Sequence, residues 1–145
     1  METMRILLVE NETHMAEGTA AALAQYGFAC DTASGSHDAL QLLRLGSYRS
    51  AILDHYLHGE TSDYLVAHLR VWHPQTRIVS VIDPPPCVRD MPLDRCDADF
   101  RFRKPLKVPD LAEVLRYLDA TSDWFDCPDT GLHSAIPMRY LASSA

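Results

Sequence analysis

Cysteine pairs, basic runs and long apolar segments are all absent from this sequence. Its four cysteines (Cys30, Cys87, Cys96 and Cys127) show no CxxC spacing, so they do not indicate a zinc site. A net charge of −7 without a lysine- or arginine-rich run disfavours a nucleic-acid-binding surface. No apolar stretch approaches the roughly 20 residues that a membrane-spanning helix needs. The apolar run at 6–9 is too short for a secretory signal, so we expect a cytoplasmic protein.

A glycine-rich loop after the first strand is also missing, which disfavours a carrier of a phosphate-bearing cofactor. The chain has 145 residues, of which 47% are hydrophobic and 23% charged, as in an ordinary globular protein. This length suits one domain. We expect the domain to span 1–119. Residues 120–145 form a tail that is either partly disordered or docked on the domain or on a partner copy.

Short apolar runs alternate with helical patterns along the first 119 residues. Strands are expected at 4–10, 28–33, 50–56, 77–82 and 100–103, and helices at 13–26, 37–45, 63–72 and 109–119. Such alternation predicts βαβ units and a parallel sheet, hence an α/β fold. The last strand is polar and is expected at a sheet edge.

Capping residues and prolines mark where these elements end. Ser36 and Ser62 are expected to cap the second and third helices, and Gly27 and Gly46 to end the first and second. A loop is expected at 57–61. Prolines at 84–86 and at Pro92 interrupt the region where a fourth helix would lie, so that helix is expected to be irregular.

Three chemically active side chains stand where strands end. Asp54 closes the apolar run 51–53, Glu10 follows the first strand, and Lys104 follows the last. Ligands and chemistry gather at the carboxyl ends of strands in a parallel sheet. We therefore expect the two acids and the lysine to meet at one edge.

Together these stretches resemble the receiver domain of bacterial two-component response regulators. The resemblance covers about residues 4–119 and implies an atypical, single-domain member of this family. It is carried by Arg5-Ile-Leu-Leu-Val-Glu-Asn-Glu12, Ile52-Leu-Asp-His-Tyr-Leu-His-Gly59, Asp97-Ala98-Asp99 and Lys104-Pro105. It implies a flavodoxin-like (βα)5 fold, with a doubly wound five-stranded sheet in the order 2-1-3-4-5.

The resemblance also implies a function for the strand-end residues. Asp54 matches the aspartate that accepts a phosphoryl group from a histidine kinase or a histidine phosphotransfer protein in a phosphorelay. Lys104 matches the lysine that stabilises the phosphoryl charge. Magnesium would be held by Glu10, Asn11, Asp54 and the Tyr56 carbonyl. A single domain of this kind signals by protein–protein contact and is not an enzyme.

Four positions depart from the family's pattern. Asn11 is neutral where the family has a second carboxylate, which implies weaker magnesium binding. Ile82 replaces the hydroxyl residue of the switch, and Asp83 replaces a small residue. Arg101 stands at the aromatic switch position. The alternative interpretation is therefore a degenerate receiver that acts as a phosphorylation-independent protein-binding module, and a homodimer is a further possibility.

Two minor features also allow alternatives. His55 and His58 have a spacing that could suggest a metal pair, but solvated loop histidines are the favoured interpretation. Arg101 and Arg103 form either a local anion- or partner-binding patch or an exposed strand edge. An enzyme is a further alternative. A phosphohydrolase with an aspartate nucleophile would need a second acid at the position of Tyr56, so this alternative is disfavoured.

Overall fold

The structure is a computed structural model that describes residues 3–57, 60–82 and 98–120. The predicted irregular fourth helix and Asp83 fall at 83–97, outside the described residues. The predicted tail also lies outside them, apart from Ala120, which ends the last helix.

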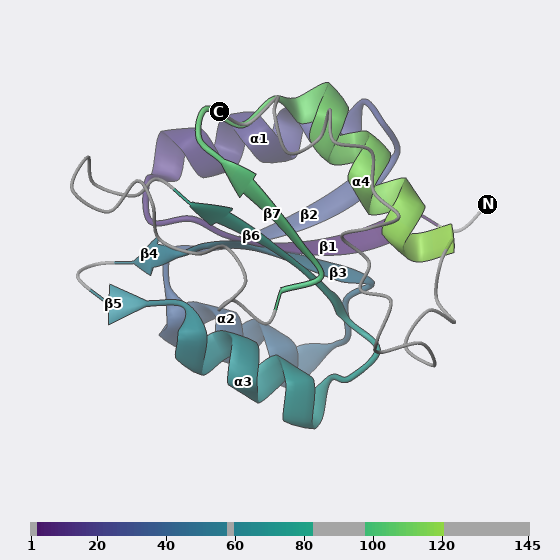
Figure 1. The fold of residues 1–145 in the computed structure, drawn as a ribbon. Coiled ribbons are helices and arrows are strands. Elements are labelled where there is room, and N and C mark those ends of the chain that lie inside the picture. The colour runs from purple at the N-terminus through teal and green to yellow at the C-terminus, as the bar shows by residue number, and fades with distance from the viewer. Residues whose placement is uncertain (1–2, 58–59, 83–97, 121–145) are drawn as a thin grey trace.

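A five-stranded parallel sheet forms the centre of the molecule (Figure 1). Its order is β2-β1-β3-β6-β7, which is 2-1-3-4-5 when these five strands are counted along the chain, as predicted. The strands are β1 (Met4–Val9), β2 (Phe28–Ala33), β3 (Ser50–Asp54), β6 (Arg77–Ile82) and β7 (Phe100–Arg103).

Helices cover both faces of the sheet. They are α1 (Thr13–Ala24), α2 (Ser36–Leu45), α3 (Asp63–Trp72) and α4 (Val108–Ala120). Helices α1 and α4 lie on one face, and α2 and α3 lie on the other (Figure 1). The described part of the chain contains no helix long and apolar enough to cross a membrane.

The side chains of β1 alternate between two buried faces of the sheet, which explains why this strand is a continuous apolar run. Ile6 and Leu8 belong to the core under α1 and α4, whereas Leu7 and Val9 belong to the core under α2 and α3. Successive side chains of a strand point to opposite faces, so a strand covered on both sides must be apolar at every position. All four side chains are buried, and each contributes about 1.5–3 kcal/mol of apolar burial.

A short hairpin follows β3 where a loop was predicted. Strands β4 (Tyr56–Leu57) and β5 (Glu60–Thr61) pair antiparallel, and β3 itself ends at Asp54. The predictions of a strand reaching Tyr56 and a loop at 57–61 were therefore wrong in detail. Two-residue strands are too short to show a period of two in the sequence.

The helix ends were predicted with mixed success. Ser36 is the first residue of α2, and Gly35 occupies the N-cap position. Ser62 is at the N-cap position of α3, but its side chain makes no capping hydrogen bond. Gly46 is the C-cap of α2, as predicted. Gly27 lies beyond the end of α1, in a turn with φ of +92°, where a residue without Cβ is favoured.

The last strand lies at a sheet edge, as predicted, but it is not exposed. Phe100 and Phe102 are buried with ring centroids 4.8 Å apart. Arg101 is only 8% exposed, so the exposed-edge interpretation is wrong for this residue.

Candidate functional site

Three strand ends bring Glu10, Asp54 and Lys104 into contact. Glu10 follows β1, which pairs directly with β3 in the register Val9 to Leu53. The Lys104 Nζ lies 3.2 Å from the Asp54 Oδ2 and 3.6 Å from the Glu10 Oε2. The lysine backbone N–H donates to the Ile82 carbonyl at 2.9 Å, which ties it to the end of β6. The structure thus places the predicted acids and lysine at one edge of the sheet.

Among the described residues, the charges in contact at this edge are not balanced. Two carboxyl groups face one ammonium group, and Asp54 is only 5% exposed. Burial raises the pKa of Glu10 above its ordinary value. The Glu12 N–H, which donates to the Glu10 Oε1 at 3.1 Å, opposes the rise, the nearby Asp54 adds to it, and Lys104 opposes it. The carboxyl edge therefore retains a surplus of negative charge that suits a cation.

The predicted magnesium ligands all offer oxygen. Asn11 directly follows Glu10 and is partly exposed. Ser62 donates its N–H to the His55 carbonyl at 2.8 Å, at the base of the hairpin in which Tyr56 pairs with Thr61. The Tyr56 backbone carbonyl is the fourth predicted ligand.

The number of acidic ligands is small. In residues 3–57, 60–82 and 98–120, no group of three or more His, Cys, Asp and Glu side chains is placed to hold a metal ion. Glu10 and Asp54 are two carboxylates, and the Asn11 amide and Tyr56 carbonyl would have to complete the protein ligands. Hard oxygen donors with one surplus charge fit magnesium, and the low carboxylate count fits weak binding.

Two of the three predicted switch positions, Ile82 and Arg101, lie on strands of the sheet. Ile82 is 4% exposed at the end of β6 and offers no side-chain hydrogen-bonding group. Arg101 is the partner of Ser80 in the β6–β7 register. Asp83 falls outside the described residues.

His55 is buried, and the prediction that it is solvated was wrong. It is 7% exposed, and its ring meets the Tyr56 ring edge-on with centroids 4.7 Å apart. Leu53 and Leu57, two residues before and two residues after His55, both belong to the core under α2 and α3. That alternation was visible in the sequence and could have placed His55 inward. His58 falls outside the described residues.

Asp99 is a buried acid whose role the sequence did not predict. Its side chain is 1% exposed, and its Oδ2 accepts the Ile78 N–H at 2.6 Å. Its Oδ1 lies 3.4 Å from Arg70 on α3. These contacts fasten the start of β7 to β6 and α3, so Asp99 acts in the architecture and not in the site.

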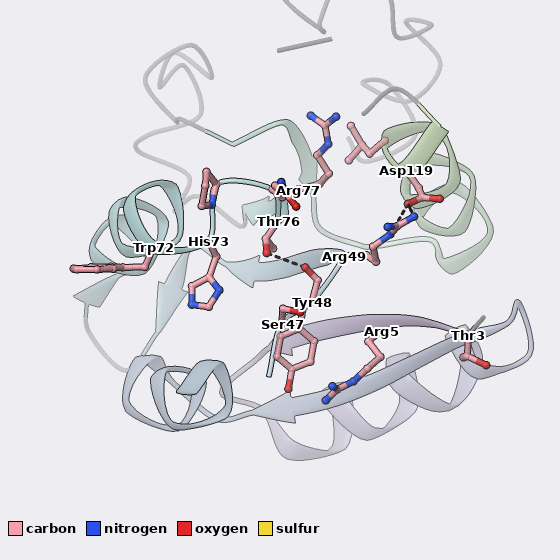
Figure 2. A pocket seen from close by; sticks show the side chains of 13 residues that line it. Thr3, Arg5, Ser47, Tyr48, Arg49, Trp72, His73, Thr76, Arg77 and Asp119 are labelled. Carbon is pink, nitrogen blue, oxygen red and sulfur yellow. Dashed lines mark hydrogen bonds and ion pairs between the residues drawn. The ribbon is translucent and has the colours of Figure 1, made fainter. Parts of the chain in front are cut away.

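A hollow lies at the opposite, amino edge of the sheet (Figure 2). Its volume is about 980 Å³, and Arg5, Arg49 and Arg77 line it. Arg5 lies 2.8 Å from Asp31, and Arg49 lies 2.6 Å from Asp119. The carboxyl ends of α3 and α4 also lie here, and helix C-termini carry partial negative charge. Two of these arginines are thus paired with acids, which reduces the attraction of the hollow for an anion.

Comparisons with known proteins identify the fold. No family model matches the chain, and no curated protein matches it. Several solved structures do match. A CheY-like receiver domain from Methanospirillum hungatei has 19% identity and a TM-score of 0.74 over 84% of this chain and 98% of its own.

Two further matches were solved in informative states. The response regulator TrrA from Thermotoga maritima, in complex with Mg(2+)-BeF, has 25% identity and a TM-score of 0.67, covering 79% of this chain and 98% of its own. A Burkholderia pseudomallei response regulator with a phosphorylated aspartic acid has 19% identity and a TM-score of 0.69, covering 87% and 74%. This chain therefore has the flavodoxin-like fold of the receiver domains of response regulators.

Proposed function

We propose that this protein is a response regulator that accepts a phosphoryl group on Asp54 from a phosphohistidine. The donor is a histidine kinase or a histidine phosphotransfer protein, and the output is protein–protein contact in the cytoplasm. The observation that carries the proposal is the buried Asp54 carboxylate with the Lys104 ammonium 3.2 Å away, at the carboxyl end of a parallel sheet.

The transfer is a displacement at phosphorus. An oxygen of Asp54 forms a bond to the phosphorus atom while the bond from phosphorus to the donor histidine nitrogen breaks. The electron pair of that bond returns to the imidazole, and Asp54 becomes an acyl phosphate. Lys104 is placed to neutralise charge on the phosphoryl oxygens as a compact, movable cation.

A magnesium ion would be held by Glu10, Asn11, Asp54 and the Tyr56 carbonyl. When bound, it supplies charge neutralisation between the carboxylates and the incoming phosphoryl oxygens. The TrrA structure, which contains Mg(2+)-BeF, supports this assignment by analogy of fold. The neutral Asn11 makes the proposed binding weak.

The alternative is a phosphorylation-independent binding module of the same fold. Ile82 at the end of β6 favours it, because a side chain without a hydroxyl cannot hold the phosphoryl group as the family's switch residue does. Asn11 favours it too, because it removes one carboxylate from the cation site. A homodimer would be one way for such a module to act.

Intact-protein mass after incubation with acetyl phosphate tests the proposal. We expect wild type to gain one phosphoryl group with magnesium and none with a chelator, and Asp54→Ala to gain none in either case. Asp63→Ala, a change at an exposed carboxylate on α3, is the matched control and should behave as wild type.

Failure of acetyl phosphate and of a panel of phosphorylated histidine kinases would overturn the proposal in favour of the binding module. Turnover beyond one phosphate per chain in a generic phosphatase assay would instead favour an enzyme.

A further inference from the structure

Three buried polar side chains next to the acceptor strand each have an atom without a hydrogen-bond partner. Within the part of the chain that the structure describes, these atoms are the His55 Nδ1, the Ser62 Oγ and the Ser80 Oγ. Their residues are 7%, 1% and 0% exposed, respectively. A polar group that loses water without gaining a partner destabilises the fold. Stability therefore does not explain why these three groups are there.

The backbone places the three side chains on the same face of the sheet. Ser80 pairs with Leu53 in the β3–β6 register, and His55 is two residues after Leu53, so both face α2 and α3. Ser62 donates its N–H to the His55 carbonyl, which holds these two residues side by side at the base of the hairpin. Ser80 lies diagonally across the β3–β6 ladder from His55, because the ladder pairs Ser80 with Leu53. The three groups thus form a diagonal polar row on this face of the sheet.

Ser62 provides a second observation that points the same way. It occupies the N-cap position of α3, where a serine hydroxyl usually accepts a backbone N–H of the first turn. Its hydroxyl makes no such bond, although its carbonyl accepts the Val66 N–H at 2.9 Å and starts the helix. The hydroxyl is therefore available to a partner inside the core.

The row is attached to the acceptor through the backbone. His55 directly follows Asp54, and its N–H donates to the Val81 carbonyl at 2.9 Å while its carbonyl accepts the Ser62 N–H at 2.8 Å. These two bonds tie the His55 backbone to β6 and to the hairpin, so a movement of the Asp54 backbone is passed to both through His55.

The far end of the row reaches the last strand. Ser80 pairs with Arg101 in the β6–β7 register, and both residues are buried. Paired residues of a parallel ladder share a face, so the row runs from Ser62 through His55 and Ser80 toward Arg101. Arg101 is the residue at which the resemblance to receiver domains predicted a switch.

We propose that His55, Ser62 and Ser80 form a buried polar relay that carries the state of Asp54 to Arg101 on β7. The relay rests on the proposed phosphorylation of Asp54 and replaces the hydroxyl that Ile82 lacks. In the unphosphorylated chain its hydrogen bonds are unmade. In the phosphorylated chain the displaced His55 ring bonds to a serine hydroxyl, and the packing beside Arg101 changes.

Amide spectra of 15N-labelled full-length protein, recorded with magnesium before and after adding beryllofluoride, test the relay. We expect shifts of the amides at 100–102 in wild type and their loss in His55→Leu and in Ser80→Ala. His55→Asn, which retains a polar atom near the Nδ1 position, should restore them. Ser50→Ala is the matched control, since Ser50 is 1% exposed and has an unpartnered hydroxyl at the other end of β3.

Intact mass after acetyl phosphate treatment is measured on each variant to separate the two proposals. A phosphoryl gain on every variant with wild-type shifts in both His55→Leu and Ser80→Ala would overturn the relay and leave the proposed function standing. No phosphoryl gain and no beryllofluoride response in wild type would overturn both. Ser80→Ala removes one hydroxyl that makes no bond, so it keeps the test valid even if His55→Leu does not fold.

Discussion

Charged side chains are paired differently at the two edges of the central sheet. At the amino edge, Arg5 is paired with Asp31 and Arg49 with Asp119, at 2.8 and 2.6 Å. At the carboxyl edge, Glu10 and Asp54 share Lys104, so two carboxyl groups of the described residues contact one ammonium group. Unbalanced charge in a half-buried place does not stabilise a fold. The imbalance therefore marks the carboxyl edge as a candidate binding site.

The pKa values express the same difference. Burial raises the pKa of Glu10, which means that the folded chain disfavours its charged form. The Tyr48 hydroxyl and then Arg5 lower the pKa of Asp31, which means that the folded chain favours its charged form. At the amino edge, the contacts of Asp31 stabilise the fold. At the carboxyl edge, the burial of Glu10 lowers stability.

Removing the lysine should have the largest effect on the carboxyl edge. In Lys104→Met, the two carboxyl groups lose their shared cation, and developing phosphoryl charge loses its stabilising group. We expect the rate of phosphoryl gain from acetyl phosphate to fall by roughly 10²- to 10³-fold. The control is Lys107→Met, an exposed lysine of the same loop, for which an equal fall would contradict the assigned role.

Removing Asp99 should have the largest effect on stability. In Asp99→Ala, the buried Ile78 N–H loses its acceptor and Arg70 loses its carboxylate. We expect the free energy of unfolding, measured with urea, to fall by about 2–4 kcal/mol. Glu17→Ala, on the exposed side of α1, should change it little. The comparison between the edges is contradicted if folded Asp99→Ala also loses phosphoryl acceptance.

Stability should respond to pH with opposite sign at the two edges. Because the pKa of Glu10 is raised from 4.5 on folding, stability falls as pH rises from 4.5 through the folded value. Because the pKa of Asp31 is lowered from 3.8, it contributes stability above 3.8 that is lost as pH falls through the folded value.

Urea unfolding at neutral and acidic pH checks this sign. Without metal, Glu10→Gln should be more stable than wild type at neutral pH, with the gap closing near pH 4.5 and below. Asp31→Asn should be less stable at neutral pH, with the gap closing below pH 3.8. Gaps of the same sign at neutral pH would remove the distinction between the edges.

The smallest effect is expected from one hydroxyl at the amino edge. Tyr48 donates to the Asp31 Oδ2 at 2.7 Å, and burial followed by this hydrogen bond raises the pKa of Tyr48 to about 12. Tyr48→Phe should lower the free energy of unfolding by about 0.5–1.5 kcal/mol. A larger loss would mean that the ring itself had moved, which the near-ultraviolet circular dichroism spectrum would reveal.

The sequence predicted the sheet well because the sheet is buried on both faces. Runs such as 6–9 and 51–53 have no exposed position, and helical spacing between them leaves few other topologies. The meeting of Glu10, Asp54 and Lys104 followed from the rule that parallel strands end at one edge.

What the sequence did not predict depends on distant partners or on very short elements. Arg49 and Asp119 are 70 residues apart, and Asp99 meets Ile78 from 21 residues away, so neither contact leaves a local pattern. The hairpin at 56–61 is too short to show a period. His55 was predicted to be solvated because a residue in a loop after a strand has no fixed face, whereas its neighbours Leu53 and Leu57 are both in the core.

The position of Lys104 has a consequence for the protein between signals. Lys104 is a tethered counter-ion: the chain itself fixes its concentration beside Glu10 and Asp54, and neither dilution nor a chelator can remove it. The two acids therefore stay assembled in a metal-free solution, where repulsion would otherwise push them apart. In the proposed mechanism, a cation that binds Glu10 and Asp54 competes with this tethered ammonium group, which stays close to the atom of Asp54 that would carry the phosphoryl group.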